Sequence, residues 1–160
     1  MNMDPCHLGR RAMLKVTALA VIGSIFTPVH AEALPAITVW KDPNCGCCGG
    51  WVEHLRRNGI AATVIDTADM QAIKAERRVP PELASCHTAE IAGYTIEGHV
   101  PAAAILKLLA ERPPGRGLAV PGMPVGSPGM EGGQPEAYDV MLFGSAAPTR
   151  FGRFLGDKQI

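Results

Sequence analysis

The alternation of hydrophobic and polar positions predicts a chain in which short strands and helices follow one another. Residues 37–40 are all β-branched or aromatic and run into a turn-forming Asp-Pro-Asn, which is typical of a strand. From about Cys47, apolar residues recur at helical spacing until Asn58-Gly59 supplies a C-terminal stop. The same patterns predict strands at residues 62–66, 93–98 and 138–143 and helices at residues 68–78 and 102–112. We therefore expect an α/β fold with a β-α-β-α-β core.

A segment rich in Gly and Pro, residues 115–135, separates the last predicted helix from the last predicted strand. Its composition argues against a helix or a regular strand. A structureless stretch of ~20 residues inside a compact domain usually either has a function or indicates a fault in the assignment, and we favour the first interpretation. We expect it to form a long loop packed near the cysteines. The residues after Ser145 are expected to fray. This gives one domain at residues 34–145 and a C-terminal tail at residues 146–160.

The first 31 residues differ from the rest of the chain. Three basic residues precede an uncharged apolar run at residues 16–26, and Val29-His30-Ala31 fits a signal-peptidase site. A transmembrane helix would need ~20 apolar residues, about twice the length of this run. We therefore expect residues 1–31 to be a signal peptide, with a mature exported chain that begins at Glu32 or close after it. The pair Arg10-Arg11 also resembles a twin-arginine export motif, so that route and general secretion both remain open.

The composition argues against polyanionic partners. Fifteen basic and fifteen acidic residues give a formal charge of zero, so no strong field would attract nucleic acid or an anionic membrane surface. At 160 residues and 47% hydrophobic content, the chain has the size of one ordinary domain with appendages. We expect neither nucleic acid nor, once the signal is removed, a membrane as a partner.

The cysteines are the strongest chemical signal. The chain has five cysteines, and Cys6 would leave with the signal peptide, so four remain in the expected mature chain. An even number in an exported protein can indicate structural disulfides. Adjacent cysteines such as Cys47 and Cys48 cannot easily bridge each other, however, and a domain of this size can bury enough core without disulfides. The crowding of the cysteines therefore favours a functional site.

Three kinds of site fit these cysteines. The Cys45-x-Cys47-Cys48 sequence lies at the predicted N-terminus of a helix, where thiolates are stabilised. A soft metal ion would need several converging thiolates, and Cys86-His87 could supply another sulfur and an imidazole from a separate loop. A redox dithiol would need only Cys45 and Cys48, whereas a structural zinc would use all four thiolates. The spacing favours the soft metal and leaves the other two open.

Methionine and histidine positions add to this hypothesis. Met123 and Met130 lie in the Gly/Pro-rich segment, and a thioether suits Cu(I) but does little for zinc. Packing of these methionines remains the alternative. His87 follows a candidate ligand and His99 belongs to the polar face of its predicted strand, so each is a candidate ligand or a hydrogen-bond donor to one. His54 is expected to be a partly exposed surface residue.

Four separated motifs can be interpreted together. They are Lys41-Asp-Pro-Asn-Cys-Gly-Cys-Cys-Gly-Gly-Trp51, Ser85-Cys-His-Thr88, Glu97-Gly-His-Val-Pro101, and Val120-Pro-Gly-Met-Pro124 with Gly126-Ser-Pro-Gly-Met-Glu131. In this order they resemble the family of small exported metal-binding proteins that includes the copper-resistance protein CopG. The resemblance extends over nearly all of residues 37–143.

The resemblance implies a thioredoxin-like fold, a periplasmic location and a role in copper resistance. It also implies a cysteine-bridged cluster of more than one copper ion and an interconversion of Cu(I) and Cu(II), which would make the protein a copper oxidoreductase. Copper ions and other periplasmic copper-handling proteins would be its partners. A thiol-disulfide oxidoreductase using Cys45 and Cys48 is the alternative function. Carried over by motif, the metal-site residues would be Cys45, Cys47, Cys48, Cys86, His87, His99, Met123 and Met130.

Overall fold

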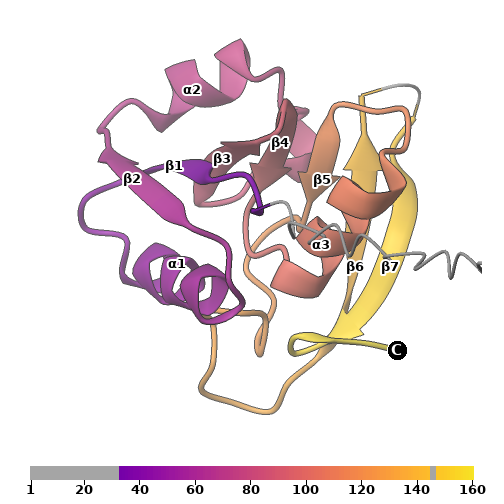
Figure 1. The fold of residues 1–160 in the computed structure, drawn as a ribbon. Helices are drawn as coiled ribbons and strands as arrows, with labels where there is room; N and C mark the ends of the chain where they lie inside the picture. Colours follow the sequence, from indigo (N-terminus) through magenta and orange to yellow (C-terminus); the bar gives the residue numbers. More distant parts are fainter. Residues whose placement is uncertain (1–32, 145–146) are drawn as a thin grey trace, which may run out of the picture. The chain divides into compact units, whose positions relative to one another are not determined.

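A single mixed sheet of eight strands organises the part of the chain that the computed structural model describes, residues 33–144 and 147–160. The strand order is β2-β1-β3-β4-β5-β6-β7-β8 (Figure 1). The expected signal peptide, with Cys6, His30 and its cleavage site, lies outside the described residues. No helix within the described ranges is long and apolar enough to cross a membrane.

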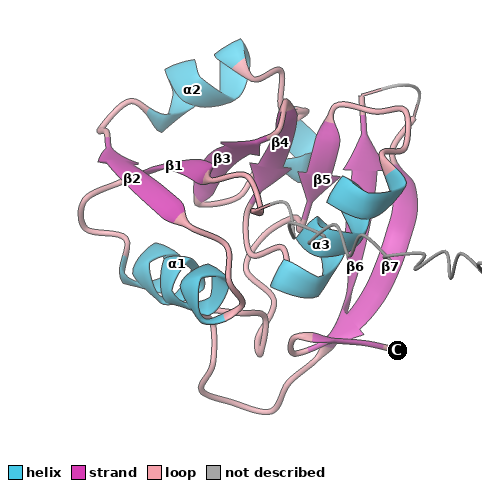
Figure 2. Cartoon of the chain, viewed as in Figure 1, coloured by secondary structure: helices cyan, strands magenta, loops and turns pink. Residues whose placement is uncertain are grey.

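The elements follow one another as short strands and helices (Figure 2). They are β1 (Ile37–Lys41), α1 (Gly46–Arg57), β2 (Ala62–Asp66), α2 (Met70–Glu76), the 3₁₀ turn η1 (Pro81–Leu83), β3 (His87–Ile91), β4 (Tyr94–Glu97), α3 (Ala102–Glu111), β5 (Gly117–Ala119), β6 (Ala137–Phe143), β7 (Thr149–Leu155) and β8 (Lys158–Gln159).

The α/β class and every strand and helix predicted from the sequence are confirmed, with α2 shorter at both ends than expected. The strands β1 and β2 are parallel neighbours connected by α1, and β3 and β4 form an antiparallel hairpin between β1 and β5. The helices α1 and α2 lie on opposite sides of this half of the sheet (Figure 2). Gly59 ends α1 because its positive φ of 81° suits a residue without a Cβ atom.

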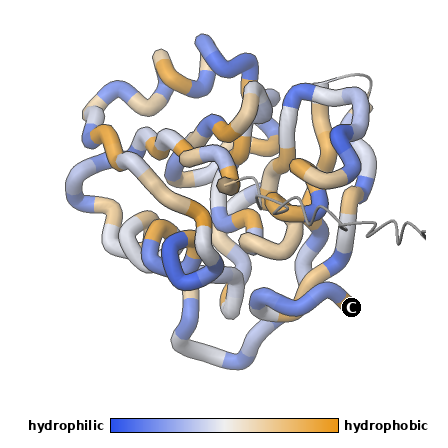
Figure 3. Tube along the Cα trace, viewed as in Figure 1, coloured by the Kyte–Doolittle hydropathy of each residue, from blue (hydrophilic) through white to orange (hydrophobic). Residues whose placement is uncertain are grey.

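The hydrophobic core joins α1 and α3 to the sheet. Trp51 and Leu55 of α1 and Ile105 of α3 are fully buried in one cluster with strand residues such as Val39 and Ile96. Figure 3 shows hydrophobic stretches along the strands and hydrophilic ones at the C-terminal end of α1 and in the C-terminal segment. Burial of this apolar face supplies most of the stability of such helices, at about 25 cal/mol for each Å² removed from water.

Two expectations about irregular segments are wrong. Residues 117–119, inside the segment expected to lack regular strand, form the short strand β5, which pairs with β4 and β6. The tail expected to fray instead contains β7, which pairs with β6 along most of its length. Phe154 of β7 is buried and stacks with Tyr138 of β6 at a ring-centroid distance of 6.3 Å. The tail is therefore part of the sheet and of its core.

We predict that Phe154→Ala lowers the free energy of unfolding by about 3 kcal/mol, because a fully buried phenyl ring is replaced by a cavity. Its neighbour Leu155, 43% exposed, is the matched control, and Leu155→Ala should change the free energy by about 0.5 kcal/mol or less. Urea denaturation of both variants measures the difference. Equal, small effects would show that the tail does not contribute to the core.

Candidate metal centre

Strand register brings three chain segments to one end of the sheet. Lys41 at the end of β1 is opposite His87 at the start of β3, and Thr88 is opposite Glu97 at the end of β4. Both pairings are antiparallel, so the residues that follow β1, precede β3 and follow β4 emerge at the same place. Those residues include the cysteines before and within the first turn of α1, together with Cys86 and His99.

The first three cysteines surround the beginning of α1. Cys45 is the N-cap residue, and among the described residues no side chain accepts a hydrogen bond from the free N–H groups of the first turn. Cys45 and Cys48 form a disulfide, whereas Cys47 and Cys86 are the free thiols among the described cysteines. The Cys47 Sγ lies 3.5 Å from the Cys45 Sγ. The sulfurs of all four cysteines lie within 4.8 Å of one another.

A second ligand group shares one of these sulfurs. The Cys86 Sγ lies 3.3 Å from His87 Nδ1 and 3.1 Å from His99 Nε2. Ligand atoms of Cys86, His87 and His99 lie within 4.8 Å of one another, as in the four-cysteine group. Cys86 therefore stands at the junction of a sulfur-rich group and a sulfur-imidazole group. This arrangement suits soft or borderline metal ions, for which thiolate and imidazole are preferred ligands.

The two histidines are buried in forms that suit ligands. His99 Nδ1 donates to the carbonyl oxygen of Pro128 at 2.7 Å, which leaves the lone pair of Nε2 directed at Cys86. Burial lowers the pKa of His99, and burial together with the neighbouring His99 and Lys74 lowers the pKa of His87 well below its ordinary value. Both rings are therefore neutral at neutral pH.

His87 also has a polar atom that needs a partner. Its Nε2 is buried without a hydrogen-bond partner among the described residues, and its ring lies against Trp51 at a centroid distance of 4.3 Å. Burying a polar nitrogen without a partner costs free energy. The ring nitrogen beside Cys86 is Nδ1, so His87 could bind a metal ion there through Nδ1.

The thiol of Cys86 is protonated in the metal-free protein. Burial, and then the neighbouring Cys47, raises the pKa of the Cys86 thiol to about 11, although a contact from the Ser85 hydroxyl opposes the change. A metal ion must therefore displace a proton to bind this sulfur, and binding is expected to release protons.

The Gly/Pro-rich loop packs beside the cysteines, as the sequence predicts. Gly129 has a φ of 89°, and a Cβ atom there would lie 2.5 Å from the Cys47 carbonyl oxygen and 2.7 Å from the Trp51 nitrogen. A Cβ atom on Gly50 would likewise lie 3.0 Å from the Gly129 Cα. Backbone therefore packs directly on backbone at the first turns of α1, and only glycine allows this approach.

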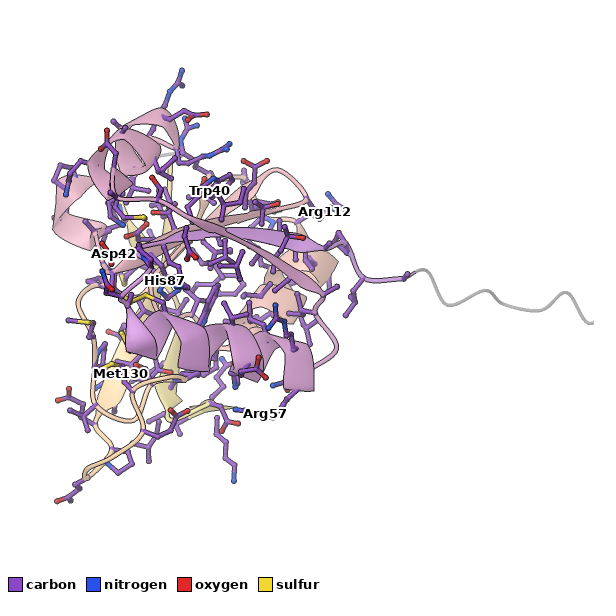
Figure 4. The ribbon with its side chains drawn as sticks, turned by 90° about the vertical axis from the view of Figure 1, so that its left-hand side faces the viewer. Trp40, Asp42, Arg57, His87, Arg112 and Met130 are labelled. Carbon is purple, nitrogen blue, oxygen red and sulfur yellow. A yellow bond between two sulfur atoms is a disulfide. The ribbon has the colours of Figure 1, made fainter. Side chains whose placement is uncertain are left out.

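The two methionines of this loop differ in exposure. Met130 follows Gly129 and is half-buried, and Figure 4 shows it with His87 on the side where α1 begins, with Arg57 at the other end of the helix. Met123 is 52% exposed. Its neighbour Gly122 accepts a hydrogen bond from the Ser85 hydroxyl, which fixes the backbone of this part of the loop beside the Cys86 turn.

The expectation of a partly exposed His54 is wrong. The side chain is buried, and its Nε2 accepts a hydrogen bond from the backbone N–H of Ala102 at 3.0 Å. His54 thereby satisfies a free N–H group at the N-terminus of α3, where Pro101 offers no side-chain cap. Its position three residues after Trp51, on the same helix face, is a signal that could have predicted burial.

Two solved structures are similar to this chain. They are named "Copper resistance protein copG", form 1 and form 2, and each is 49% identical in sequence. Each match covers 76% of this chain and 98% of the other, with TM-scores of 0.71 and 0.72. The family described as "Protein of unknown function, DUF411" matches residues 83–130, and no curated protein matches. At this identity and coverage, the chain belongs to the CopG family of copper-resistance proteins.

Proposed function

We propose that this protein is a periplasmic copper-binding protein of copper resistance, which holds more than one copper ion in a cysteine-bridged cluster. The observation that carries the proposal is the shared position of Cys86. Its sulfur lies within 4.8 Å of three other sulfurs and also close to two buried imidazoles. A thiolate at such a junction can bridge metal ions, and Cu(I) favours thiolate ligands. The name of the two similar structures supports copper as the metal.

The ligands of this cluster would be Cys45, Cys47, Cys48, Cys86, His87 and His99, with Met123 and Met130 as further thioether donors. The half-buried Met130 is the better placed of the two methionines, since its loop packs on the first turns of α1. The exposed Met123 would serve as a ligand at the rim of the site. Export by the predicted signal peptide would place the protein where periplasmic copper-handling proteins could exchange copper with it.

The strand order supports the thioredoxin-like fold implied by the sequence resemblance. The parallel pair β1 and β2, connected by α1, lies beside the antiparallel hairpin β3-β4 in the order β2-β1-β3-β4. The strands β5 to β8 extend this unit into a larger sheet.

The Cys45–Cys48 disulfide gives the cluster a route to copper redox chemistry. When two thiolates form an S–S bond they release two electrons, and each electron can reduce one Cu(II) to Cu(I). The reverse reaction would restore both thiolates and oxidise two Cu(I) ions. The same disulfide supports the alternative function, a thiol-disulfide oxidoreductase, because a Cys-x-x-Cys pair at a helix N-terminus suits disulfide exchange.

Replacement of the two free thiols separates these functions. We expect Cys47→Ser and Cys86→Ser each to lower the copper bound per chain, because a hydroxyl cannot replace a soft bridging thiolate. The metal-to-protein ratio after anaerobic loading, compared with the parent, measures this. A disulfide-reductase assay on these two variants and on Cys45→Ser is the control. An unchanged ratio of one copper or fewer, with reductase activity that only Cys45→Ser abolishes, would favour the oxidoreductase.

Separate methionine variants test the thioether ligands. We expect Met130→Leu to weaken Cu(I) retention by about tenfold and to leave Zn(II) retention nearly unchanged, because leucine keeps the volume but lacks the soft sulfur. Met141, which packs on the small cluster of Leu83, Ala119 and Phe143, is the matched control. Titration against a Cu(I) chelator decides the point. Equal retention by Met130→Leu and Met141→Leu would assign Met130 to packing alone.

A further inference from the structure

A buried ion pair lies directly behind the Cys86 turn. Lys74 of α2 and Glu97 of β4 form a salt bridge, with side chains 8% and 0% exposed. The Lys74 ammonium also donates to the Thr88 hydroxyl, which in turn donates to Glu97 Oε2 at 2.7 Å. Glu97 also contacts the candidate metal centre. Its Oε1 accepts a hydrogen bond of 2.6 Å from the backbone N–H of Ser85, the residue before Cys86.

A contribution to folding stability does not by itself explain why this ion pair is buried. Taking two charges out of water costs several kcal/mol for each ion, and apolar residues of similar volume often replace a buried ion pair with no loss of stability. What an apolar pair could not supply is an acceptor for the Ser85 N–H. That hydrogen bond fixes the backbone immediately before Cys86, at the point where β3 begins.

Ser85 connects the Glu97 carboxylate to two other parts of the site. Its backbone leads directly into Cys86, and its hydroxyl donates to the Gly122 carbonyl in the Gly/Pro-rich loop. The turn also has little room to move, because the Ser85 side chain lies against Gly98, where an added Cβ atom would lie only 2.6 Å from the Ser85 Cβ. Among these contacts, the Glu97 carboxylate is the acceptor for the backbone N–H just before the shared sulfur.

We propose that Glu97, oriented by Lys74, is a positioning residue that fixes Cys86 at the junction of the two ligand groups through the backbone N–H of Ser85. This inference rests on the proposed function, in which Cys86 bridges copper ions. Metal centres tolerate only small displacements of their ligands, about 0.5 Å. Loss of the Ser85 hydrogen bond should therefore weaken copper binding even when the fold remains intact.

Two charge-free double variants isolate the acceptor. Lys74→Met with Glu97→Gln removes both charges, while the amide oxygen can still accept from Ser85 and the amide nitrogen can donate to Thr88. Lys74→Met with Glu97→Leu also removes both charges but offers no acceptor. A third variant, Arg77→Met with Glu90→Gln, breaks the other ion pair between the end of α2 and the β3-β4 hairpin without a contact to Ser85.

The first readout needs no copper. In the full chain with Cys6→Ser, Cys47 and Cys86 are the free thiols and their sulfurs lie within 4.8 Å of each other, so dibromobimane should cross-link them. We expect cross-linking in the parent, the Gln variant and the Arg77/Glu90 variant, and its loss in the Leu variant. Chelator competition should show Cu(I) held about tenfold more weakly by the Leu variant only. Urea denaturation reports whether stability has changed as well.

The outcomes separate the two proposals. Equal cross-linking and equal copper retention in the Gln and Leu variants would overturn the positioning role. A different result would be loss of cross-linking in the Leu variant together with a parent protein that binds one copper ion or none. It would support the role of Glu97 and contradict the proposed function. If the Leu variant does not fold, hydrogen exchange of the Ser85 amide in the parent decides. Slow exchange, like that of the β3 amides, is expected, and exchange as fast as in open loops would overturn the proposal.

Discussion

The antiparallel pairing of β3 with β1 is the constraint on which the rest of the site depends. It sets His87 opposite Lys41, so the start of β3 lies beside the end of β1, from which the chain leads into α1. The pairing of β3 with β4 brings His99 to the same end of the sheet. A register shift of one residue would turn His87 to the other face of the sheet and separate it from Trp51. The two clusters of candidate ligands thus depend on strand register as much as on the Cys-x-Cys-Cys motif.

At this end of the sheet the protein buries, fully or partly, polar groups that lack some of their hydrogen-bond partners. His87 is fully buried with an unpartnered nitrogen, and Cys86 carries a thiol whose pKa burial raises to about 11. Burial of such groups costs free energy, and a cation bound by the Cys86 sulfur and His87 Nδ1 would offset part of that cost. The loop packs on the first turns of α1 through Gly129, and Glu97, paired with Lys74, accepts a hydrogen bond from the Ser85 N–H just before Cys86.

The sequence predicted the elements whose burial follows a simple period. The apolar run of β1 and the spacing of Trp51 and Leu55 in α1 are examples, and Gly59 marked the helix end. It did not predict β3, because His87 and Thr88 are polar and yet buried beside the site, so no alternation is visible. The strand β7 was missed because its buried Phe154 lies among arginines and exposed positions. Chemistry and motif pointed to the four cysteines, His87 and His99, and the structure brings their side chains together. Glu97 accepts a hydrogen bond from a backbone N–H group, which no sequence pattern marks.

Copper-edge X-ray absorption of the full chain, loaded anaerobically with Cu(I), tests the bridging role of Cys86 most directly. We expect copper surrounded mainly by sulfur, with a copper–copper interaction that is absent or much reduced in Cys86→Ser. Copper bound only by nitrogen and oxygen, or isolated copper ions with no copper–copper interaction in the parent, would contradict a cysteine-bridged cluster.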